Sequence, residues 1–340
     1  MPGESSGATV RKFPAAWAVG APSAARGARG ASAVWAFLAV ALAAAAVGGE
    51  SGGAPMTRDE LDRFDGAKRF LPLSDGVTLA YLDVGARDGT PLVLIHGYTD
   101  SARDWAPIEP LLAAQFRLLI VDLRGHGASS KPDCCYTRFD FAYDVKLLLD
   151  ALHVERADVA GHSLGSLVAQ TFAELWPQAT RRLILISSTG TSFGDISTAK
   201  NSSGGALPGW LEDVEKLQDP IDANSEFMKD WWRVSMSVNP EFFSHKQRVD
   251  AAAIPARVWR AIADQSLLGV DLQGMLPRIK ASTLLIWGGR DALAGSAGRE
   301  ALRRGIAHAQ VRTFDSLGHD LFWEDPAGVA AAITGFLANP

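Results

Sequence analysis

The stretch that most constrains the fold is residues 159–166, VAGHSLGS. A short apolar run at residues 157–160 predicts a strand before it, and apolar residues recur at helical spacing from Leu164 to Trp176 after it. Between them, Gly161 and Gly165 flank Ser163 in a G-x-S-x-G pattern. A serine on so sharp a turn takes a strained backbone and needs neighbours without bulky side chains. We predict an exposed nucleophilic hydroxyl at a helix N-terminus, the alternative being a glycine-rich turn with an incidental serine.

Patterns of buried strands alternate with helical patterns along most of the chain. Besides residues 157–160, strands are predicted at residues 77–84, 92–95, 116–121, 183–186, 282–287 and 310–314. Helical spacing is found around residues 105–112, 139–152, 300–306 and 326–337. Such alternation predicts right-handed βαβ units, and hence an α/β fold with a mainly parallel twisted sheet flanked by helices.

This pattern is interrupted over residues 190–276. The interval is far longer than a usual connection of about 2–6 residues, so it must be inserted structure. Its apolar residues share helical faces around Phe227 and Trp231 and again around Ile254 and Val258. We predict a core formed by residues 56–189 and 277–340, with a helical cap inserted at residues 190–276.

Residues 1–55 differ from the rest of the chain. Residues 1–30 carry four basic residues against a single acid, Glu4, and an uncharged apolar run follows at residues 31–47. The pattern is typical of a secretory signal or of a short membrane anchor through residues 31–47, and we favour these two interpretations. The alternative is a non-functional extension upstream of a start at Met56, which would make the protein cytoplasmic.

Charge and cysteine content argue against other kinds of site. The formal net charge is −5, with acids and bases interspersed, so no nucleic-acid surface is predicted. The only cysteines, Cys134 and Cys135, are adjacent. Adjacent cysteines supply no metal-ligand set and rarely bond to each other, so neither a metal site nor a disulfide is predicted.

A serine nucleophile needs a base, and the base needs a third group that fixes its tautomer. The order Ser…Asp/Glu…His along a doubly wound sheet is one known solution. His319 follows the last predicted strand, and Asp291 follows the strand before it. Because carboxyl ends of parallel strands converge on one edge, we predict that Ser163, Asp291 and His319 form the catalytic group.

Other histidines and acids fit these roles less well. His96 and His126 belong to turns beside glycines and are predicted to be structural, and His162 is poorly aimed at Ser163. The remaining histidines lie outside the strand-end motifs: His153, His245 and His308. Four acids lie too near His319 in sequence to bond its far ring nitrogen readily: Asp315, Asp320, Glu324 and Asp325.

Acyl transfer builds negative charge on the carbonyl oxygen, so two preorganised N–H donors are needed. We predict the backbone N–H groups of Leu164, after the nucleophile, and Tyr98, in the turn after strand 92–95. Five side chains are predicted to line the substrate pocket: Tyr98, His162, Trp231, Trp232 and Trp259. The alternatives are that Tyr98 is a partly exposed loop residue and that each tryptophan only packs the cap against the core.

Taken together, these residues resemble the α/β-hydrolase fold family, in particular its capped bacterial hydrolases. The family motifs occur here in order: HG-x at 96–97, D-x-R-G-x-G-x-S at 122–129, G-H-S-x-G at 161–165, W-G-x-x-D at 287–291 and G-H at 318–319. They cover about residues 70–338, and the one departure is Gly289, where the family often has a polar residue. The resemblance implies a serine hydrolase that needs no cofactor.

The leading hypothesis is hydrolysis of a small to medium, fairly apolar carboxylic ester or lactone through an acyl-enzyme. Ser163 argues against the epoxide hydrolases and haloalkane dehalogenases of the family, which have an aspartate there. His162 and the absence of G-G-S-W-G argue against the proline iminopeptidases. Two alternatives remain: a lyase, C–C bond hydrolase or cofactor-free peroxidase on the same residues, or a non-catalytic protein that binds a ligand in the pocket.

Overall fold

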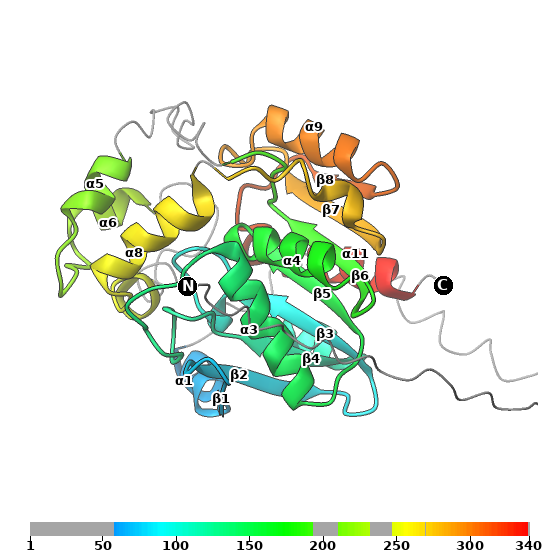
Figure 1. Cartoon of the computed structure of the whole chain (residues 1–340), viewed down its shortest axis with the longest axis horizontal. Helices are drawn as coiled ribbons and strands as arrows, with labels where there is room; N and C mark the ends of the chain where they lie inside the picture. The colour runs from blue at the N-terminus through cyan, green and yellow to red at the C-terminus, as the bar shows by residue number, and fades with distance from the viewer. Residues whose placement is uncertain (1–57, 193–209, 232–246, 269, 339–340) are drawn as a thin grey trace, which may run out of the picture. The chain divides into compact units, whose positions relative to one another are not determined.

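The computed structural model describes residues 58–192, 210–231, 247–268 and 270–338. All of them belong to one contact unit of the chain, Ser51–Pro340. Within it, eight strands form one sheet in the order β1-β2-β4-β3-β5-β6-β7-β8 (Figure 1). Their bounds are β1 Arg69–Pro72, β2 Thr78–Gly85, β3 Thr90–Ile95, β4 Phe116–Val121, β5 Ala157–His162, β6 Thr180–Ile186, β7 Ser282–Gly288 and β8 Gln310–Phe314.

The sheet is mainly parallel, as the alternating sequence pattern predicts. Strands β3 to β8 pair in parallel, and β2 pairs antiparallel with both β1 and β4. The sequence analysis missed β1, which has only four residues and lies at the edge of the sheet with three of them exposed. So short a strand with little burial shows no apolar periodicity, and its pairing with β2 is a tertiary contact.

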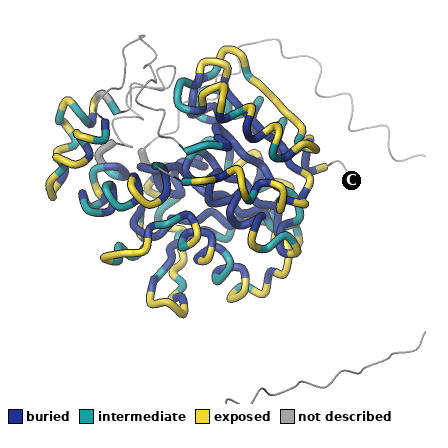
Figure 2. Tube along the Cα trace, turned by 45° about the horizontal axis from the view of Figure 1, so that its top comes forward, coloured by how far each residue is buried: buried dark blue, intermediate teal, exposed yellow. Residues whose placement is uncertain are grey.

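Successive residues of the central strands point to opposite faces of the sheet, and each face has its own apolar core. The interior of the tube in Figure 2 is accordingly coloured as buried. Val93 and Ile95 belong to the core that includes residues of α3 and α4. Leu92 and Leu94 belong to the core beneath α2, α10 and α11. Burial on both faces explains why these strands read as continuous apolar runs.

The helices around the sheet are α1 Arg58–Gly66, α2 Glu109–Ala113, α3 Arg138–Ala151, α4 Leu164–Leu175, α9 Ser296–Gly305, α10 Leu321–Glu324 and α11 Pro326–Ala338. Two 3-10 turns accompany them, η1 Ala102–Trp105 and η6 Leu276–Arg278. The helical pattern around residues 105–112 is divided into η1 and α2. Pro107 and Pro110 explain the division, because proline lacks an N–H and disfavours helix in the residue before it.

Between β6 and β7 the described residues form a group of short helices. They are α5 Trp210–Lys216, α6 Glu226–Trp231, η4 Gln247–Ala251, α8 Ala256–Ile262 and η5 Ala263–Leu267. Arg257 donates to the carbonyl oxygen of Pro132 at 2.5 Å, and Ser266 Oγ donates to that of Tyr136 at 2.6 Å. These helices therefore contact the long loop after β4, at the carboxyl edge of the sheet. The helical cap and its boundaries at 190 and 276 stay predictions, since residues 193–209 and 232–246 lie outside the described part. We refer to the five short helices α5, α6, η4, α8 and η5 as the cap.

One expectation about the chain was wrong, and two others are not addressed by the described residues. Cys134 and Cys135 are bonded to each other as a disulfide in an exposed loop, which we did not predict from two adjacent cysteines. The predicted signal or anchor at residues 1–55 and the alternative start at Met56 lie outside the described residues. Among the described residues, no helix is both long and apolar enough to cross a membrane.

Candidate active site

Ser163 occupies the turn between β5 and α4, at the carboxyl edge of the sheet. Its backbone has φ 51° and ψ −118°, a region that non-glycine residues rarely adopt and that costs free energy. The turn is also tight, because a Cβ on Gly161 would collide with the carbonyl oxygen of Gly165. The strained turn and the crowded glycines have the geometry predicted for a nucleophile, and Ser163 is partly exposed.

His319 follows β8 and Asp291 follows β7, and their side chains form a direct pair. Nδ1 of His319 lies 2.9 Å from Oδ1 of Asp291. The backbone N–H groups of Leu293 and Ala294 donate to the same oxygen at 2.9 and 3.2 Å. Burial alone would raise the pKa of Asp291, but His319 and these two N–H groups lower it to about 2. The charged carboxylate keeps a proton on Nδ1, which leaves Nε2 of His319 able to accept one.

Two contacts place this pair and the turn at residues 96–98 near the turn that carries Ser163. His162, which precedes Ser163, lies with its ring centroid 5.0 Å from that of His319. On the other side, a Cβ on Gly97 would lie 3.5 Å from Cβ of Ser163. Among the described residues, Ser163 Oγ has no hydrogen-bond partner. Such a bond between nucleophile and base is often long before substrate binds.

The turn at residues 96–98 carries one of the two predicted oxyanion donors. The N–H groups of Tyr98 and Leu164 have no backbone acceptor among the described residues. The turn itself is held by two buried histidines, since Nε2 of His96 accepts from the N–H of Leu123 at 3.0 Å and Nε2 of His126 lies 2.5 Å from the carbonyl oxygen of Tyr98. Burial and the nearby His126 lower the pKa of His96 to about 3, so this ring is neutral.

Aromatic side chains of the core and the cap meet beside the same turn. The ring of Tyr98 lies 5.8 Å from that of Trp231 and 5.4 Å from that of Trp259, between centroids. Trp231 Nε1 donates to Oγ1 of Thr99 at 2.9 Å, and the Tyr98 hydroxyl donates to the carbonyl oxygen of Trp259. Tyr98 is therefore buried rather than a partly exposed loop residue. Trp259 is fully buried, which favours the packing alternative, whereas Trp231 is partly exposed; Trp232 lies outside the described side chains.

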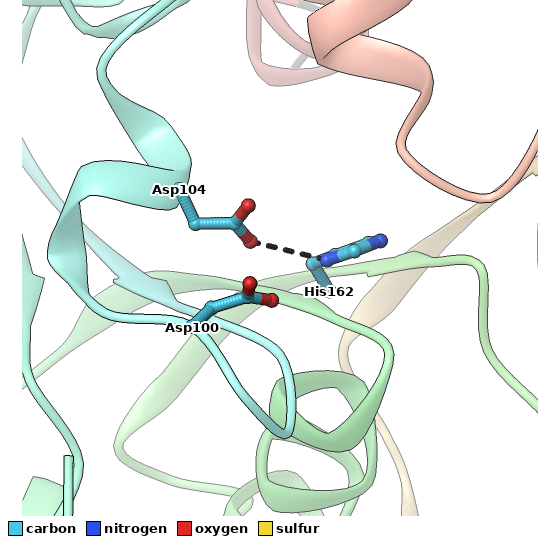
Figure 3. A group of neighbouring side chains, drawn as sticks. All are labelled: Asp100, Asp104 and His162. Atoms are coloured by element: carbon cyan, nitrogen blue, oxygen red, sulfur yellow. Dashed lines mark hydrogen bonds and ion pairs between the residues drawn. The ribbon is translucent and has the colours of Figure 1, made fainter. Parts of the chain in front are cut away.

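His162, predicted to line the pocket, is instead buried, and both of its ring nitrogens have partners. Figure 3 shows the bond between His162 and Asp104, with Asp100 beside them. Nδ1 lies 3.1 Å from Oδ2 of Asp104 and Nε2 lies 3.0 Å from the carbonyl oxygen of His319. Asp100 is also close, and ligand atoms of the two aspartates and His162 lie within 4.8 Å of one another. These residue types can bind a metal, but Asp104 and His162 already bond each other, as in a buried ion pair. This placement favours a structural role for His162 over a pocket role.

Comparison with known proteins decides the family. The family model for the alpha/beta hydrolase fold matches residues 90–326. The chain belongs to the α/β-hydrolase fold family. It is 30% identical over 274 residues to a 2-hydroxymuconate semialdehyde hydrolase of Pseudomonas sp. (strain CF600), covering 78% of this chain and 93% of that protein.

Two solved structures are also similar to this α/β-hydrolase. A hydrolase from Pseudomonas aeruginosa PA01 is 29% identical with a TM-score of 0.61, over 81% of this chain and 99% of its own. Est816, described as an N-acyl homoserine lactone degrading enzyme, is 26% identical with a TM-score of 0.61, over 77% of this chain and 98% of its own. These likenesses support a hydrolase activity.

Sequence analysis of this α/β-hydrolase missed two residues that hold His319. Asp104 bonds His162, and Ser187 Oγ donates to the carbonyl oxygen of His319 at 2.6 Å. Ser187 had a usable signal, because it directly follows a predicted strand and so lies at the catalytic edge of the sheet. Asp104 lies in a helical turn among polar and charged neighbours, so only its burial, which the sequence does not reveal, shows that it needs a partner.

Proposed function

We propose that this protein is a serine hydrolase of carboxylic esters or lactones, with Ser163 as nucleophile, His319 as base and Asp291 as the acid that orients the base. The observation that carries the proposal is the 2.9 Å bond between His319 and Asp291, from neighbouring strand ends, beside a strained serine turn. The base and the acid of a Ser-His-Asp group are then paired, and the proposal places the hydroxyl of Ser163 next to the base once substrate binds. The likeness to Est816 supports the lactone branch of this proposal.

In the proposed reaction, Ser163 Oγ attacks the carbonyl carbon while its proton moves to Nε2 of His319. Negative charge develops on the carbonyl oxygen, and the N–H groups of Tyr98 and Leu164 are proposed to stabilise it. The C–O bond breaks as His319 returns the proton to the leaving alkoxide. Water then attacks the acyl-enzyme with His319 again as base, which releases the carboxylic acid and restores Ser163.

The cap side of the site favours an apolar acyl or alcohol group. Beside the oxyanion turn, the rings of Tyr98, Trp231 and Trp259 pack together, and their polar atoms bond the hydroxyl of Thr99 and backbone carbonyl oxygens. An apolar group that contacts Trp231 and Tyr98 gains from leaving water and needs no charged partner there. We therefore propose small to medium apolar esters or lactones rather than highly charged ones.

The test is hydrolysis of a C2 to C12 series of p-nitrophenyl esters and of acyl homoserine lactones by the full chain. We expect turnover of at least one class and a loss of at least about 10³-fold in Ser163→Ala. Ser282→Ala is the matched control, because Ser282 is exposed at the opposite, amino end of β7 and should leave activity unchanged. A folded protein inactive toward every ester and lactone would overturn the ester and lactone proposal.

One comparison favours a second candidate, cleavage of a C–C bond. The 30% identical relative is named a 2-hydroxymuconate semialdehyde hydrolase, and the chain covers 93% of it. The same serine, histidine and aspartate would serve a substrate in which a carbonyl lies next to the bond that breaks. Incubation with 2-hydroxymuconate semialdehyde, followed by product analysis, separates the candidates. Faster turnover of this compound than of any ester or lactone would favour the C–C hydrolase.

A further inference from the structure

The most unusual polar group near the site is His162, whose two ring nitrogens both face acceptors. Nδ1 faces a carboxylate oxygen of Asp104 at 3.1 Å, and Nε2 faces the backbone carbonyl oxygen of His319 at 3.0 Å. A neutral imidazole has one N–H and can satisfy only one of these acceptors, whereas the protonated ring has two. Because one of the two acceptors is a carboxylate, the geometry matches an imidazolium.

The carboxylates around His162 stabilise a positive charge on it. Asp104 lies on η1, Asp100 on the loop before η1, and Asp320 after β8, with Oδ1 of Asp320 3.8 Å from Nε2. Burial alone would lower the pKa of His162, but the interactions with Asp104, Asp320 and Asp100 raise it to about 9. On its remaining sides the ring packs edge-on against Phe322 and beside His319.

Buried His126 provides a comparison within the same molecule. Its ring nitrogens also face two acceptors, but both are neutral backbone carbonyl oxygens, of Arg124 and Tyr98. Burial lowers the pKa of His126. Unlike His126, His162 has a carboxylate, that of Asp104, within hydrogen-bonding distance. This negative charge accounts for the opposite direction of the pKa shift of His162.

His162 connects three segments whose relative positions the proposed reaction depends on. It directly precedes Ser163, its Nε2 bonds the main chain of His319, and its Nδ1 bonds Asp104 on the segment that follows the oxyanion turn. Trp323 Nε1 in turn bonds the other oxygen of Asp104 at 3.1 Å. The carbonyl of His319 thus accepts from His162 and from Ser187, so its position is fixed from β5 and from β6.

We propose that His162, as a buried imidazolium paired with Asp104, is a positioning residue that fixes the backbone of His319 relative to Ser163. This inference rests on the proposed catalytic roles of those two residues. It assigns His162 no contact with substrate. A loss of this contact frees the loop after β8 on one side, and a misplacement of about 1 Å costs about 10²-fold in rate.

The first test compares His162→Gln, Asp104→Asn and the double variant with the parent on its best ester or lactone. We expect kcat to fall about 10- to 100-fold with KM changed less than about twofold, because alignment rather than binding is lost. The double variant should lose little more than the worse single variant, since the two residues act as one unit. His308→Gln is the matched control, because its Nε2 also bonds a backbone carbonyl, of Ala281, at the amino end of β7.

The second test is the alkaline limb of the pH profile, which a merely structural role would not produce. As pH rises through about 9, His162 loses a proton and one of its two donors, so kcat should fall reversibly in the parent. In His162→Gln this limb should disappear and leave a lower but flatter profile. A kcat within twofold of the parent, or an alkaline limb that persists unchanged in the variant, would overturn the proposal.

A third measurement needs no enzymatic activity. In the full chain labelled with ¹⁵N-histidine, the NMR signals of one ring should show both nitrogens protonated at pH 7.5, and Asp104→Asn should lower that ring's titration midpoint. A neutral ring in the parent would place the proton elsewhere and overturn the inference. An imidazolium in a protein that turns over no ester, lactone or C–C substrate would instead contradict the proposed function.

Discussion

The two sides of the candidate site are built from different interactions. On the core side, directional hydrogen bonds fix each group: Asp291 Oδ1 accepts three of them, and the carbonyl oxygen of His319 accepts two. On the cap side, Tyr98, Trp231 and Trp259 meet through ring contacts with centroids 5.2 to 5.8 Å apart.

We expect this difference to separate reactivity from selectivity. Hydrogen bonds lose most of their strength when an atom moves or is replaced, so changes on the core side should damage the chemistry itself. Aromatic packing depends on area and shape and tolerates repacking, so changes on the cap side should alter which substrates fit.

The largest effect is expected for Asp291→Asn. The amide cannot hold the proton of His319 on Nδ1 as the carboxylate does, so kcat should fall on the order of 10³- to 10⁴-fold with the fold intact. Steady-state kinetics and circular dichroism check both parts. The control is Asp315→Asn, an exposed acid that lies near His319 in sequence and should keep full activity. Equal losses in the two variants would contradict the assignment of Asp291.

A smaller and different effect is expected for Trp231→Leu. Loss of the ring removes aromatic surface worth about 0.5–1.5 kcal/mol per pair, so KM for the preferred ester should change about 3- to 10-fold and the chain-length optimum should move. The value of kcat on the shortest ester should stay within about threefold. Trp176→Leu is the control, because Trp176 packs against Phe172 and Tyr143 beside α4 instead. A large fall in kcat with an unchanged chain-length optimum would contradict the expected difference between the two sides.

The polar contact between cap and core should matter for stability more than for rate. Ser101 Oγ donates to Oδ1 of Asp250 in η4 at 3.0 Å and accepts from the N–H of Arg103 at the start of η1. Ser101→Ala should lower the free energy of unfolding by about 1–2 kcal/mol, measured by urea denaturation. Ser74→Ala, an exposed serine before β2, is the control. A variant as stable as the parent would show that this contact does not hold the cap.

The smallest effect is expected from reduction of the Cys134–Cys135 disulfide. A bond between adjacent residues closes almost no loop, so it restricts the unfolded chain little and should stabilise the fold by well under about 1 kcal/mol. Thermal unfolding and esterase assays with and without reductant should therefore agree. Arg257 of the cap bonds the same loop at Pro132, so a change in activity on reduction would mean that this loop positions the cap.

Features with a local signal were predicted from the sequence. The central strands are continuous apolar runs, and the turn at Ser163 needs flanking glycines whatever surrounds it. Both features can therefore be predicted from the sequence alone. The short edge strand β1 was missed because its four residues gain their structure by pairing with β2. The disulfide was not predicted because adjacent cysteines rarely bond to each other, and nothing in the sequence marks this pair as an exception.

Periodicity and backbone sterics along the chain are enough to specify the α/β architecture, the place of the strained serine and the strand ends from which an acid and a base could come. The burial of His162 against Asp104 and His319, the complete burial of Trp259 and the partial exposure of Trp231 depend on long-range contacts. The direction of a side chain and the charge it carries depend on groups brought together from distant parts of the chain.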